Sequence, residues 1–482
     1  MFDLAQAIRA TGQLRPLVVL ATEALSTHAA DCRRADLPFV DVTPEIERRQ
    51  HALAPHLHRL MKRFEPWCKR HDRLGNALLP SLLRMRHLRN RLRGDYSIFW
   101  ELCVAEKPAA IIIPGDRELP PVPALLQVGL DLGVPTIIEF AGVPYGSGLE
   151  LSRAPYNRFR TTLRHLPPLL NIVAARRFPE QVTLDKSGPL LFSPGWITWT
   201  LYRVGILSAN PWIQGCGACR YVFQQDRGRL RRFLEKGLPP EKAVLVGDPA
   251  LDPLYEAWVG RDELRLRLNR SYRLDPKQRL VIMAVPNDAE HDVCDWPTHL
   301  DRMDRYFSRL ADGRAQVLLS LHPKADRNNY QPLVDRHGLQ IADETLADML
   351  PAADLFVCSG SSTIFWAKLC AVPIINLDYL DVMDADFGGI GVVNVNDEVE
   401  FSDSLARFHA GGGTAIVGDL SSSSQAFRDD HLFDGQATDR ICAFLRDLAR
   451  GHAPSGGAGI DPGQCDAGAR DPKTNLLAKP AA

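Results

Sequence analysis

The stretch Ala353–Asp378, ADLFVCSGSSTIFWAKLCAVPIINLD, decides the fold predicted for this chain. Leu355–Cys358 is a short apolar run of the kind that forms a buried parallel strand. The small residues Ser359–Ser362 then turn the chain into a helix beginning near Thr363, and Ile374–Leu377 gives the next strand. A small-residue turn before a helix presents free backbone N–H groups and the positive end of the helix dipole. The pattern therefore predicts a phosphate site at the carboxyl edge of a parallel sheet.

Strand-length apolar runs alternate with helical segments on both sides of this unit. Further strands are expected at 16–21, 109–114, 135–139, 221–223, 243–246, 280–285, 316–321 and 339–342. Helices are expected over about 44–105 and at 123–132, 227–236, 299–310 and 331–337. Such alternation is typical of α/β proteins with parallel sheets.

The length of the chain argues for more than one domain, because 482 residues exceed the size at which one core usually splits. We expect two Rossmann-like, doubly wound domains that face a cleft. The expected boundaries are 1–250 for an N-terminal acceptor-side domain, 251–278 for a linker and 279–450 for a C-terminal donor-binding domain. Residues 451–482, rich in Gly, Pro, Ala and Asp, are expected to be a disordered tail.

The bulk composition excludes several classes of protein. The net charge is −1, so no nucleic-acid partner is expected. No run of 18 apolar residues predicts a membrane-spanning helix, and the first residues lack the pattern of a signal peptide. The ten cysteines are scattered, which favours free thiols in the cytoplasm. Cys216 and Cys219 form a single CxxC pair, which is weak evidence for zinc or redox chemistry.

One region is strongly basic. Between Arg48 and Arg93 there are 13 Lys and Arg residues against two acids, and apolar residues recur at helical spacing. The region is either the solvated face of helices packed on a core or a surface that attracts anionic lipid, a polyanionic glycan or a phosphorylated acceptor. The second interpretation predicts membrane-surface contact, with the chain peripheral at the inner face of the membrane.

Four motifs, in this order, carry a resemblance to a known superfamily. They are LPPEKAVLVGDPALDPLY (238–255), LLSLHPKAD (318–326), ADLFVCSGSSTIFWAKLCAVPIIN (353–376) and FDGQATDRICAFL (433–445). They resemble GT-B-fold enzymes, which include nucleotide-sugar glycosyltransferases and the hydrolysing UDP-GlcNAc 2-epimerases. The likeness is greatest to bacterial surface-polysaccharide enzymes of the glycerophosphotransferase and capsule type. The resemblance implies a GT-B-like pair of domains, with a last helix that packs back on the first domain.

The N-terminal half resembles the superfamily less. IIIPGDRELPPVPALLQVGLDLGVPTIIEFAG (111–142) is similar to the 2-epimerase pattern of Gly-Asp followed by a strand, Glu and Gly. One departure concerns the helix after the serine turn, where the family usually has Glu-Ala and the Glu is implied to hold a ribose. Here the pair is Trp366-Ala367, so the sugar of the nucleotide is bound differently or the donor is not an ordinary nucleotide.

The candidate donor-binding residues lie at strand ends of the second half. Ser359, Gly360, Ser361, Ser362 and Thr363 can hold phosphate through hydroxyl and N–H groups, or they can simply cap a buried helix. Asp378, after the next strand, either lines the donor pocket or caps a loop.

His322, Pro323 and Lys324 also follow a strand, where ligands of open α/β sheets bind. His322 is a candidate catalytic group that donates to phosphate or substrate, and Lys324 can neutralise phosphate charge. The alternative is that the His-Pro pair only terminates the strand.

Two acidic residues of the first half are candidates for the catalytic base. Asp116 and Glu139 each follow a predicted strand, and a transferase needs a base to deprotonate an acceptor hydroxyl. The alternatives are a turn or helix cap for Asp116 and a structural pair with an Arg for Glu139.

These residues predict a transferase of surface-glycan biosynthesis. It would move a sugar or polyol phosphate from a nucleotide-activated donor to a glycan or lipid-linked acceptor. No DxD metal motif is placed convincingly, so transfer without a metal or other cofactor is expected, with leaving-group charge met by the helix dipole. The alternatives are a hydrolysing nucleotide-sugar 2-epimerase and a non-catalytic nucleotide-sugar-binding protein.

Overall fold

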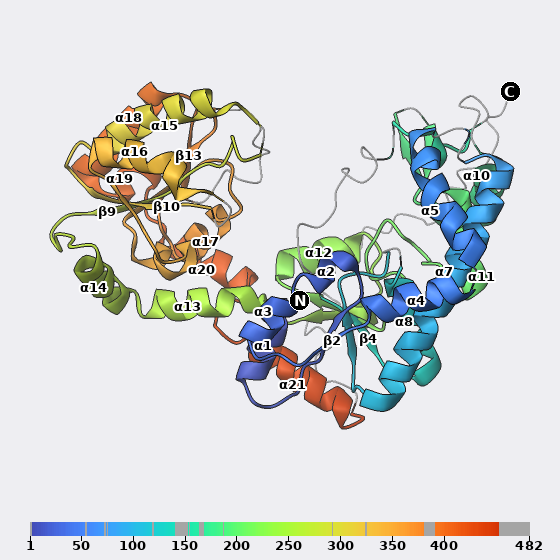
Figure 1. Cartoon of the computed structure of the whole chain (residues 1–482). Helices are drawn as coiled ribbons and strands as arrows, with labels where there is room; N and C mark the ends of the chain where they lie inside the picture. The colour runs from blue at the N-terminus through green and yellow to red at the C-terminus, as the bar shows by residue number, and fades with distance from the viewer. Residues whose placement is uncertain are drawn as a thin grey trace, which may run out of the picture.

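The computed structural model describes residues 2–53, 55–71, 74, 76–117, 120–139, 153, 155–162, 168–186, 188–291, 293–322, 325–379 and 391–452. The described chain forms two lobes that lie side by side (Figure 1). The expected disordered tail falls almost wholly outside the described residues, which end at His452.

The C-terminal lobe contains a six-stranded sheet in which every pair of neighbouring strands is parallel. In spatial order its strands are β11 (Gln340–Ile341), β10 (Gln316–Ser320), β9 (Leu280–Ala284), β12 (Leu355–Cys358), β13 (Ile374–Leu377) and β14 (Val392–Val395). Numbered from β9, this order is 3-2-1-4-5-6, the order of a doubly wound Rossmann sheet. The predicted fold class, α/β with parallel Rossmann-like sheets, is confirmed.

Helices cover both faces of this sheet (Figure 1). The helices of the lobe are α13 (Asp252–Val259), α14 (Arg261–Ser271), α15 (Trp296–Leu310), α16 (Arg327–His337), α17 (Ile364–Leu369), α18 (Glu398–Gly411), α19 (Thr414–Val417) and α20 (Ser421–Asp430). Successive strand residues enter opposite cores. Val281 and Met283 pack with α15, α16 and α18, whereas Leu280 and Ile282 pack with α13, α14 and α17. This alternation buries both faces and explains the continuous apolar runs of the sequence.

The N-terminal lobe has a smaller parallel sheet. Its four strands are, in order, β3 (Ile111–Ile113), β4 (Thr136–Ile138), β7 (Tyr221–Gln224) and β8 (Ala243–Leu245). A parallel pair, β1 (Val18–Leu20) and β2 (Phe39–Asp41), and an antiparallel hairpin, β5 (Val182–Asp185) and β6 (Gly188–Leu191), lie outside it. The helices are α1 (Phe2–Ala10), α2 (Glu23–Ser26), α3 (Ala29–Arg34), α4 (Thr43–Leu53), α5 (Pro55–Arg70), α7 (Leu78–Glu106), α8 (Val122–Leu132), α10 (Leu169–Arg177), α11 (Gly195–Val204) and α12 (Arg227–Glu235).

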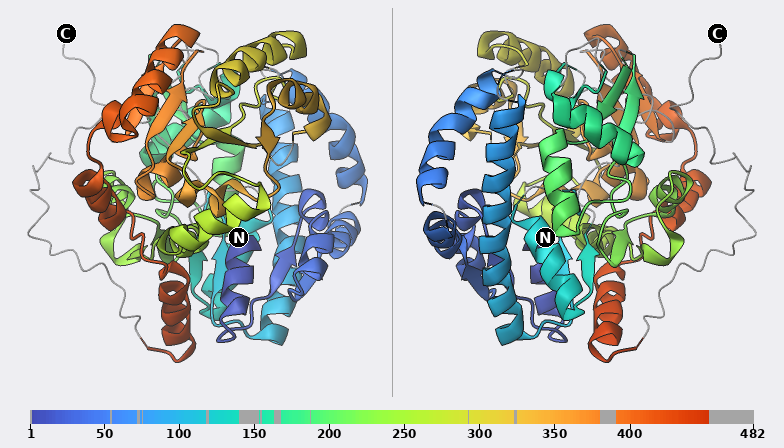
Figure 2. Two further views of the ribbon diagram at one scale, coloured as in Figure 1. Left: turned by 90° about the vertical axis from the view of Figure 1, so that its left-hand side faces the viewer. Right: turned by 90° about the vertical axis from the view of Figure 1, so that its right-hand side faces the viewer.

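The last helix, α21 (Ala437–Ala449), packs on the N-terminal sheet rather than on the sheet that precedes it in sequence. Its Ile441 and Phe444 share one apolar cluster with Phe223 and with Leu4 of α1. Figure 2 shows α21, in red, beside the N-terminal strands. This is the packing that the resemblance implied for residues 433–445.

The segment predicted as a linker, 251–278, is largely helical. It forms α13 and α14, and Leu254, Leu264 and Leu268 are buried in the same cluster as Phe356 of β12. By packing, these helices belong to the C-terminal lobe, because their apolar faces cover one side of its sheet. Within the described residues, no helix is long and apolar enough to cross a membrane.

Candidate functional site at the carboxyl edge of the C-terminal sheet

The strand order places the point of topological reversal between β9 and β12. Connections leave these two strands in opposite directions, and ligands of open α/β sheets bind in the crevice at such a point. Because all six strands are parallel, the segments that follow β9, β10, β12 and β13 meet at one edge of the sheet. The predicted residues Ser359 to Thr363, His322 and Asp378 begin three of these segments. The structure therefore brings the predicted C-terminal site residues to a single sheet edge.

The serine turn is held in place by the neighbouring strand. The Ser359 hydroxyl donates to the Leu377 carbonyl oxygen at 2.8 Å, and the Gly360 amide donates to Asn376 Oδ1 at 3.0 Å. Gly360 has a φ of 53°, in the left-handed region that favours glycine. The backbone of the turn is thus fixed, while Gly360 and Ser362 are exposed to solvent.

The hydroxyls of the turn also bond to one another and to the backbone just before the helix that follows. Ser361 Oγ accepts a 3.3 Å bond from the Thr363 amide and lies 2.8 Å from Thr363 Oγ1. The helix itself, α17, spans only six residues. A helix of this length sums few peptide dipoles, so any phosphate charge here would be met mainly by hydroxyl and N–H groups of the turn.

A polar network adjoins the turn. The Tyr379 hydroxyl donates to Asp288 Oδ2 at 2.6 Å, and Arg302 Nη1 donates to the same oxygen at 3.1 Å. The Arg302 guanidinium also lies 4.1 Å from the centre of the Tyr379 ring. Burial, together with the bond to Asp288, raises the pKa of Tyr379, so its hydroxyl stays protonated and acts as a donor.

Sequence reasoning missed Asp288 and Arg302. Asp288 lies four residues after the end of β9, so it carries the same signal, a polar residue following a buried strand, that singled out His322. Arg302 lies within α15, where no local pattern distinguishes it from the other cations of the helix.

His322 lies two residues beyond β10 and is exposed. Its ring centre is 6.2 Å from that of His291, in an edge-to-face arrangement. The other two residues of this motif, Pro323 and Lys324, lie outside the described residues, so their predicted part in phosphate binding stays a prediction.

Asp116 is a buried carboxylate that organises a loop of the N-terminal lobe. Its two oxygens accept the Gly215 amide at 3.1 Å and the Gly217 amide at 2.6 Å, and the Cys219 thiol donates to it at 3.7 Å. A Cβ on Gly217 would come within 2.5 Å of Asp116 Oδ2, so the close approach requires glycine. Burial, reinforced by Asp116, raises the pKa of the Cys219 thiol. This CxxC pair is therefore built into the loop as protonated thiols.

Glu139 follows β4 directly and is half-buried. Its amide donates to the Ile113 carbonyl oxygen at 3.1 Å, which continues the ladder between β3 and β4 by one bond. Asp116 and Glu139 thus follow adjacent strands of the N-terminal sheet at its carboxyl edge.

Trp366, at the position where the superfamily usually has Glu, contributes to the packing of the C-terminal lobe. It is half-buried on α17 and packs against the apolar cluster of α13 and α14. An indole in this position fills core space and offers no carboxylate for a ribose.

The basic region 48–93 forms most of α4, α5 and the first half of α7. Some of its cations are structural. Arg84 donates to Glu65 Oε1 at 2.7 Å, and its guanidinium lies 4.2 Å from the centre of the Trp196 ring. Others are exposed, namely Arg48, Arg59, Lys62, Arg63, Arg70, Arg86, Arg89 and Arg93.

Comparison with known proteins gives matches among solved structures alone. No protein-family model matches the chain, and no curated protein matches it. The structure of the wall teichoic acid polymerase TagF with CDPG has 15% identity and a TM-score of 0.33, over 48% of this chain and 57% of that one. The chain therefore spans less than two thirds of the TagF chain.

Matches to UDP-GlcNAc 2-epimerases cover most of both chains. The UDP-GlcNAc 2-epimerase of Neisseria meningitidis bound to UDP-GlcNAc has 8% identity and a TM-score of 0.49, over 93% of this chain and 96% of that one. The UDP-GlcNAc 2-epimerase of Methanocaldococcus jannaschii has 11% identity and a TM-score of 0.42, over 93% and 96%. The wall teichoic acid polymerase and the UDP-GlcNAc 2-epimerases are the two kinds of enzyme to which the sequence motifs are similar. The fold assignment itself rests on the strand order of the C-terminal sheet.

Proposed function

We propose that the chain is a transferase of surface-glycan biosynthesis that takes a sugar or polyol phosphate from a nucleotide-activated donor. One observation carries the proposal. The serine turn, His322 and Asp378 follow three strands of a 3-2-1-4-5-6 parallel sheet and meet at the carboxyl edge, where such sheets bind nucleotides.

In the proposed mechanism the turn holds the departing phosphate. Hydroxyl and N–H groups of Ser361, Ser362 and Thr363, with Lys324, meet the charge that develops on the leaving group. His322 donates a hydrogen bond or proton to it. The scheme keeps the sequence-based expectation of transfer without a metal ion, with the leaving-group charge met by the groups of the turn.

For the base that activates the acceptor hydroxyl, Glu139 is favoured over Asp116. Both Asp116 oxygens already accept backbone N–H groups of the 215–219 loop, so this carboxylate is engaged in holding the loop in place. We expect Glu139→Gln to lower turnover by at least tenfold with the fold retained. Asp116→Asn should instead loosen the 215–219 loop and lower thermal stability. If Glu139→Gln kept normal turnover, the assignment would fail.

Donor binding is tested by calorimetry with UDP, CDP, ADP and GDP. One of these should bind and raise the melting temperature of the chain, as expected for a ligand of the native state. The variant Ser361→Leu, Ser362→Leu should abolish that binding, whereas Ser308→Leu, at an exposed serine of α15, should leave it intact. If both variants bound the nucleotide with equal affinity, the serine turn would not be the donor site.

Turnover separates the transferase from its rival. Incubation with UDP-GlcNAc in the absence of an acceptor would release UDP and free sugar from a hydrolysing 2-epimerase, and the proposed transferase should release neither. His322→Ala is expected to reduce transfer at least tenfold, and near-normal transfer would count against its role.

We further propose that the protein binds its acceptor at an anionic membrane surface, and that α5 and the start of α7 contact this surface. Figure 1 places α5 at the outer end of the N-terminal lobe. Large apolar side chains are exposed there beside the exposed cations: Leu60 (50%), Trp67 (39%), Leu74 (63%), Leu78 (46%), Leu79 (70%) and Leu82 (48%). Apolar side chains flanked by Lys and Arg are typical of helices that lie in a membrane interface.

Vesicle flotation tests the membrane contact. The chain should float with vesicles containing phosphatidylglycerol and not with phosphatidylcholine alone. Leu79→Glu should weaken flotation severalfold, while Val399→Glu, at an equally exposed site of the other lobe, should not change it. Flotation that is the same for both lipids or both variants would contradict the proposal.

A further inference from the structure

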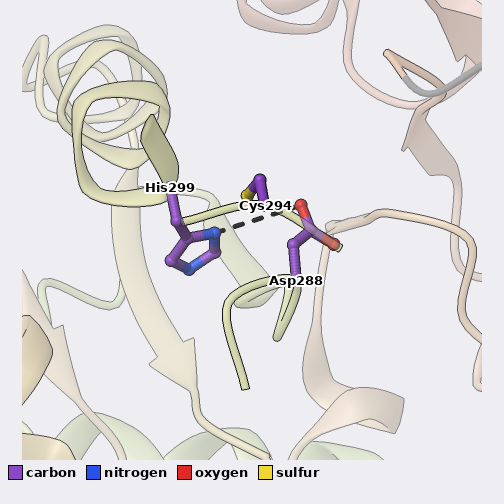
Figure 3. Close-up of side chains that lie close together, drawn as sticks. All are labelled: Asp288, Cys294 and His299. Atoms are coloured by element: carbon purple, nitrogen blue, oxygen red, sulfur yellow. Dashed lines mark ion pairs between the residues drawn. The ribbon is translucent and has the colours of Figure 1, made fainter. Parts of the chain in front are cut away.

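His299, in the first turn of α15, is a buried histidine in which one ring nitrogen has no hydrogen-bond partner among the described residues. Its side chain is fully buried, and Nδ1 has no hydrogen-bond partner among the residues that the structure describes. Figure 3 shows this nitrogen pointing toward Asp288, whose Oδ2 lies 4.0 Å away. A buried polar atom without a partner is costly, so its presence requires an explanation.

The other ring nitrogen fixes the tautomer. His299 Nε2 lies 3.0 Å from the Tyr330 hydroxyl, and that hydroxyl lies 2.8 Å from Glu290 Oε1. An ionised carboxylate only accepts, so the Tyr330 O–H donates to Glu290 and its oxygen accepts the Nε2–H. The lone pair of the ring is therefore on Nδ1, and it faces the Asp288 carboxylate. Two electron-rich atoms that face each other in a buried place leave room for a positive charge between them.

The Cys294 sulfur adds a third possible metal-ligand atom to those of Asp288 and His299. Cys294 Sγ, one carboxylate oxygen of Asp288 and a ring nitrogen of His299 all lie within 4.8 Å of one another. Around a tetrahedral zinc ion with bonds of about 2.0–2.3 Å, ligand atoms are about 3.3–3.8 Å apart. The 4.0 Å between His299 Nδ1 and Asp288 Oδ2 is thus only a few tenths of an ångström wider than a bound ion would hold such a pair. They come from one short segment, the loop after β9 and the start of α15 (Figure 3).

We propose that Asp288, Cys294 and His299 bind one divalent cation of the zinc type, in a site with three protein ligands. Sulfur, imidazole and carboxylate together suit Zn²⁺, whereas Mg²⁺ prefers oxygen ligands alone. The chain from Nε2 through Tyr330 to Glu290 is the outer hydrogen bonding that orients a metal-binding imidazole.

The surroundings are compatible with this charge. The groups that face the site are Asp288, Glu290, Arg302, Tyr330 and Tyr379. Asp288 Oδ2 already accepts bonds from Arg302 and Tyr379, but a carboxylate has about four acceptor positions and Oδ1 carries two of them.

The cation would tie the loop after β9 to α15. Because Asp288 also receives the Tyr379 hydroxyl, this tie would set the position of Tyr379 at the sheet edge that carries the serine turn. The inference does not depend on the proposed transferase activity, since it rests on the ligand set alone.

The test uses the full chain, stripped of metal with a chelator and titrated with Zn²⁺ against a chromophoric competitor. One equivalent should bind, and millimolar Mg²⁺ should not compete. Cys294→Ser and His299→Ala should each weaken binding at least tenfold. His291→Ala, at an exposed histidine three residues before Cys294, should bind as the unaltered chain does.

Cobalt gives a readout that does not depend on variants that fold poorly. Co²⁺ bound to the unaltered chain should show the absorption of a thiolate-to-cobalt bond, and this band should disappear in Cys294→Ser, whose side chain is only half-buried. Absence of stoichiometric Zn²⁺ binding, or Co²⁺ binding without the thiolate band, would overturn the proposal.

Discussion

The two sheets reach stability in different ways. In the C-terminal lobe, β9 and β10 are five residues long, and the residues of the central strands alternate between two apolar clusters, each closed by helices of the same lobe. In the N-terminal lobe, β3, β4 and β8 are only three residues long, and one face of the sheet is covered partly by α21, from the far end of the chain. The C-terminal lobe therefore builds its core from its own segments, whereas the core of the N-terminal lobe also needs α21, which follows the C-terminal lobe in sequence.

The largest effect is expected at the contact that completes the N-terminal lobe. Phe444 of α21 is 5% exposed, and its ring centre lies 5.1 Å from that of Tyr221 and 5.4 Å from that of Phe223. Phe444→Ala should lower the free energy of unfolding by about 3–5 kcal/mol, because it leaves a cavity against the sheet. Hydrogen exchange measured by mass spectrometry should show the loss in peptides of the N-terminal lobe.

A matched control is Leu266→Ala, at a side chain of α14 that is 53% exposed. It should change stability by no more than about 0.5 kcal/mol. If Phe444→Ala raised exchange equally in both lobes, the lobes would form one cooperative unit and the comparison would break down.

A smaller effect is expected inside the C-terminal lobe. Tyr330 is fully buried, and its hydroxyl bonds both His299 and Glu290. Tyr330→Phe keeps the packing but removes the partner of the buried His299 ring nitrogen and of the half-buried Glu290 carboxylate, so we expect a loss of about 1–3 kcal/mol. The loss should appear in C-terminal peptides only. Tyr202→Phe, at an exposed tyrosine, should be neutral, and equal effects of the two changes would contradict this account.

Between the lobes, Asp252 of α13 caps α21. Its carboxylate accepts the Ala437 amide at 3.0 Å and the Thr438 amide at 2.8 Å. Asp252→Ala should cost about 1 kcal/mol in urea unfolding, the usual effect of losing such a cap. Asp301→Ala, at an exposed residue paired with Arg305, serves as control. A cost no larger than that of the control would show that α21 does not need this cap.

The smallest expected effect is a pH dependence in each lobe. Burial lowers the pKa of His87 in α7, and burial lowers that of His409 in α18 despite the Asp312 carboxylate 3.6 Å away. The unfolded chain then binds protons more readily, so stability is complete above about pH 6.5 and falls as the pH drops below that value. His409→Gln should flatten this dependence in C-terminal peptides, and His87→Gln in N-terminal ones. A dependence that rises toward low pH would contradict the sign.

The sequence allowed the C-terminal lobe to be predicted strand by strand, because buried parallel strands such as Leu355–Cys358 are continuous apolar runs. The serine turn followed from the same local pattern. The secondary structure of segment 142–208 was harder to predict. Its hairpin β5–β6 and its helices α10 and α11 are set by tertiary packing among prolines and aromatic residues.

Site chemistry was harder to predict where partners come from distant segments. No local pattern indicates that Asp116 accepts amides about 100 residues later, at Gly215 and Gly217. The triad Asp288, Cys294 and His299 was not predicted for a different reason, since its members lie within one short segment. Its three ligands follow no familiar spacing, and only the fold of the β9–α15 loop brings them together.

The position of α21 also bears on how this protein is made. Residues up to Val246 supply the N-terminal sheet, but the helix residues that cover one of its faces, such as Ile441 and Leu445, are synthesised about 200 residues later. At roughly 5–20 residues per second, the part of that face that α21 covers stays exposed on the ribosome for about 10–40 s. The lobe that is translated first is therefore the last to be finished, and during that interval its incompletely covered sheet is the part of the chain most exposed to aggregation.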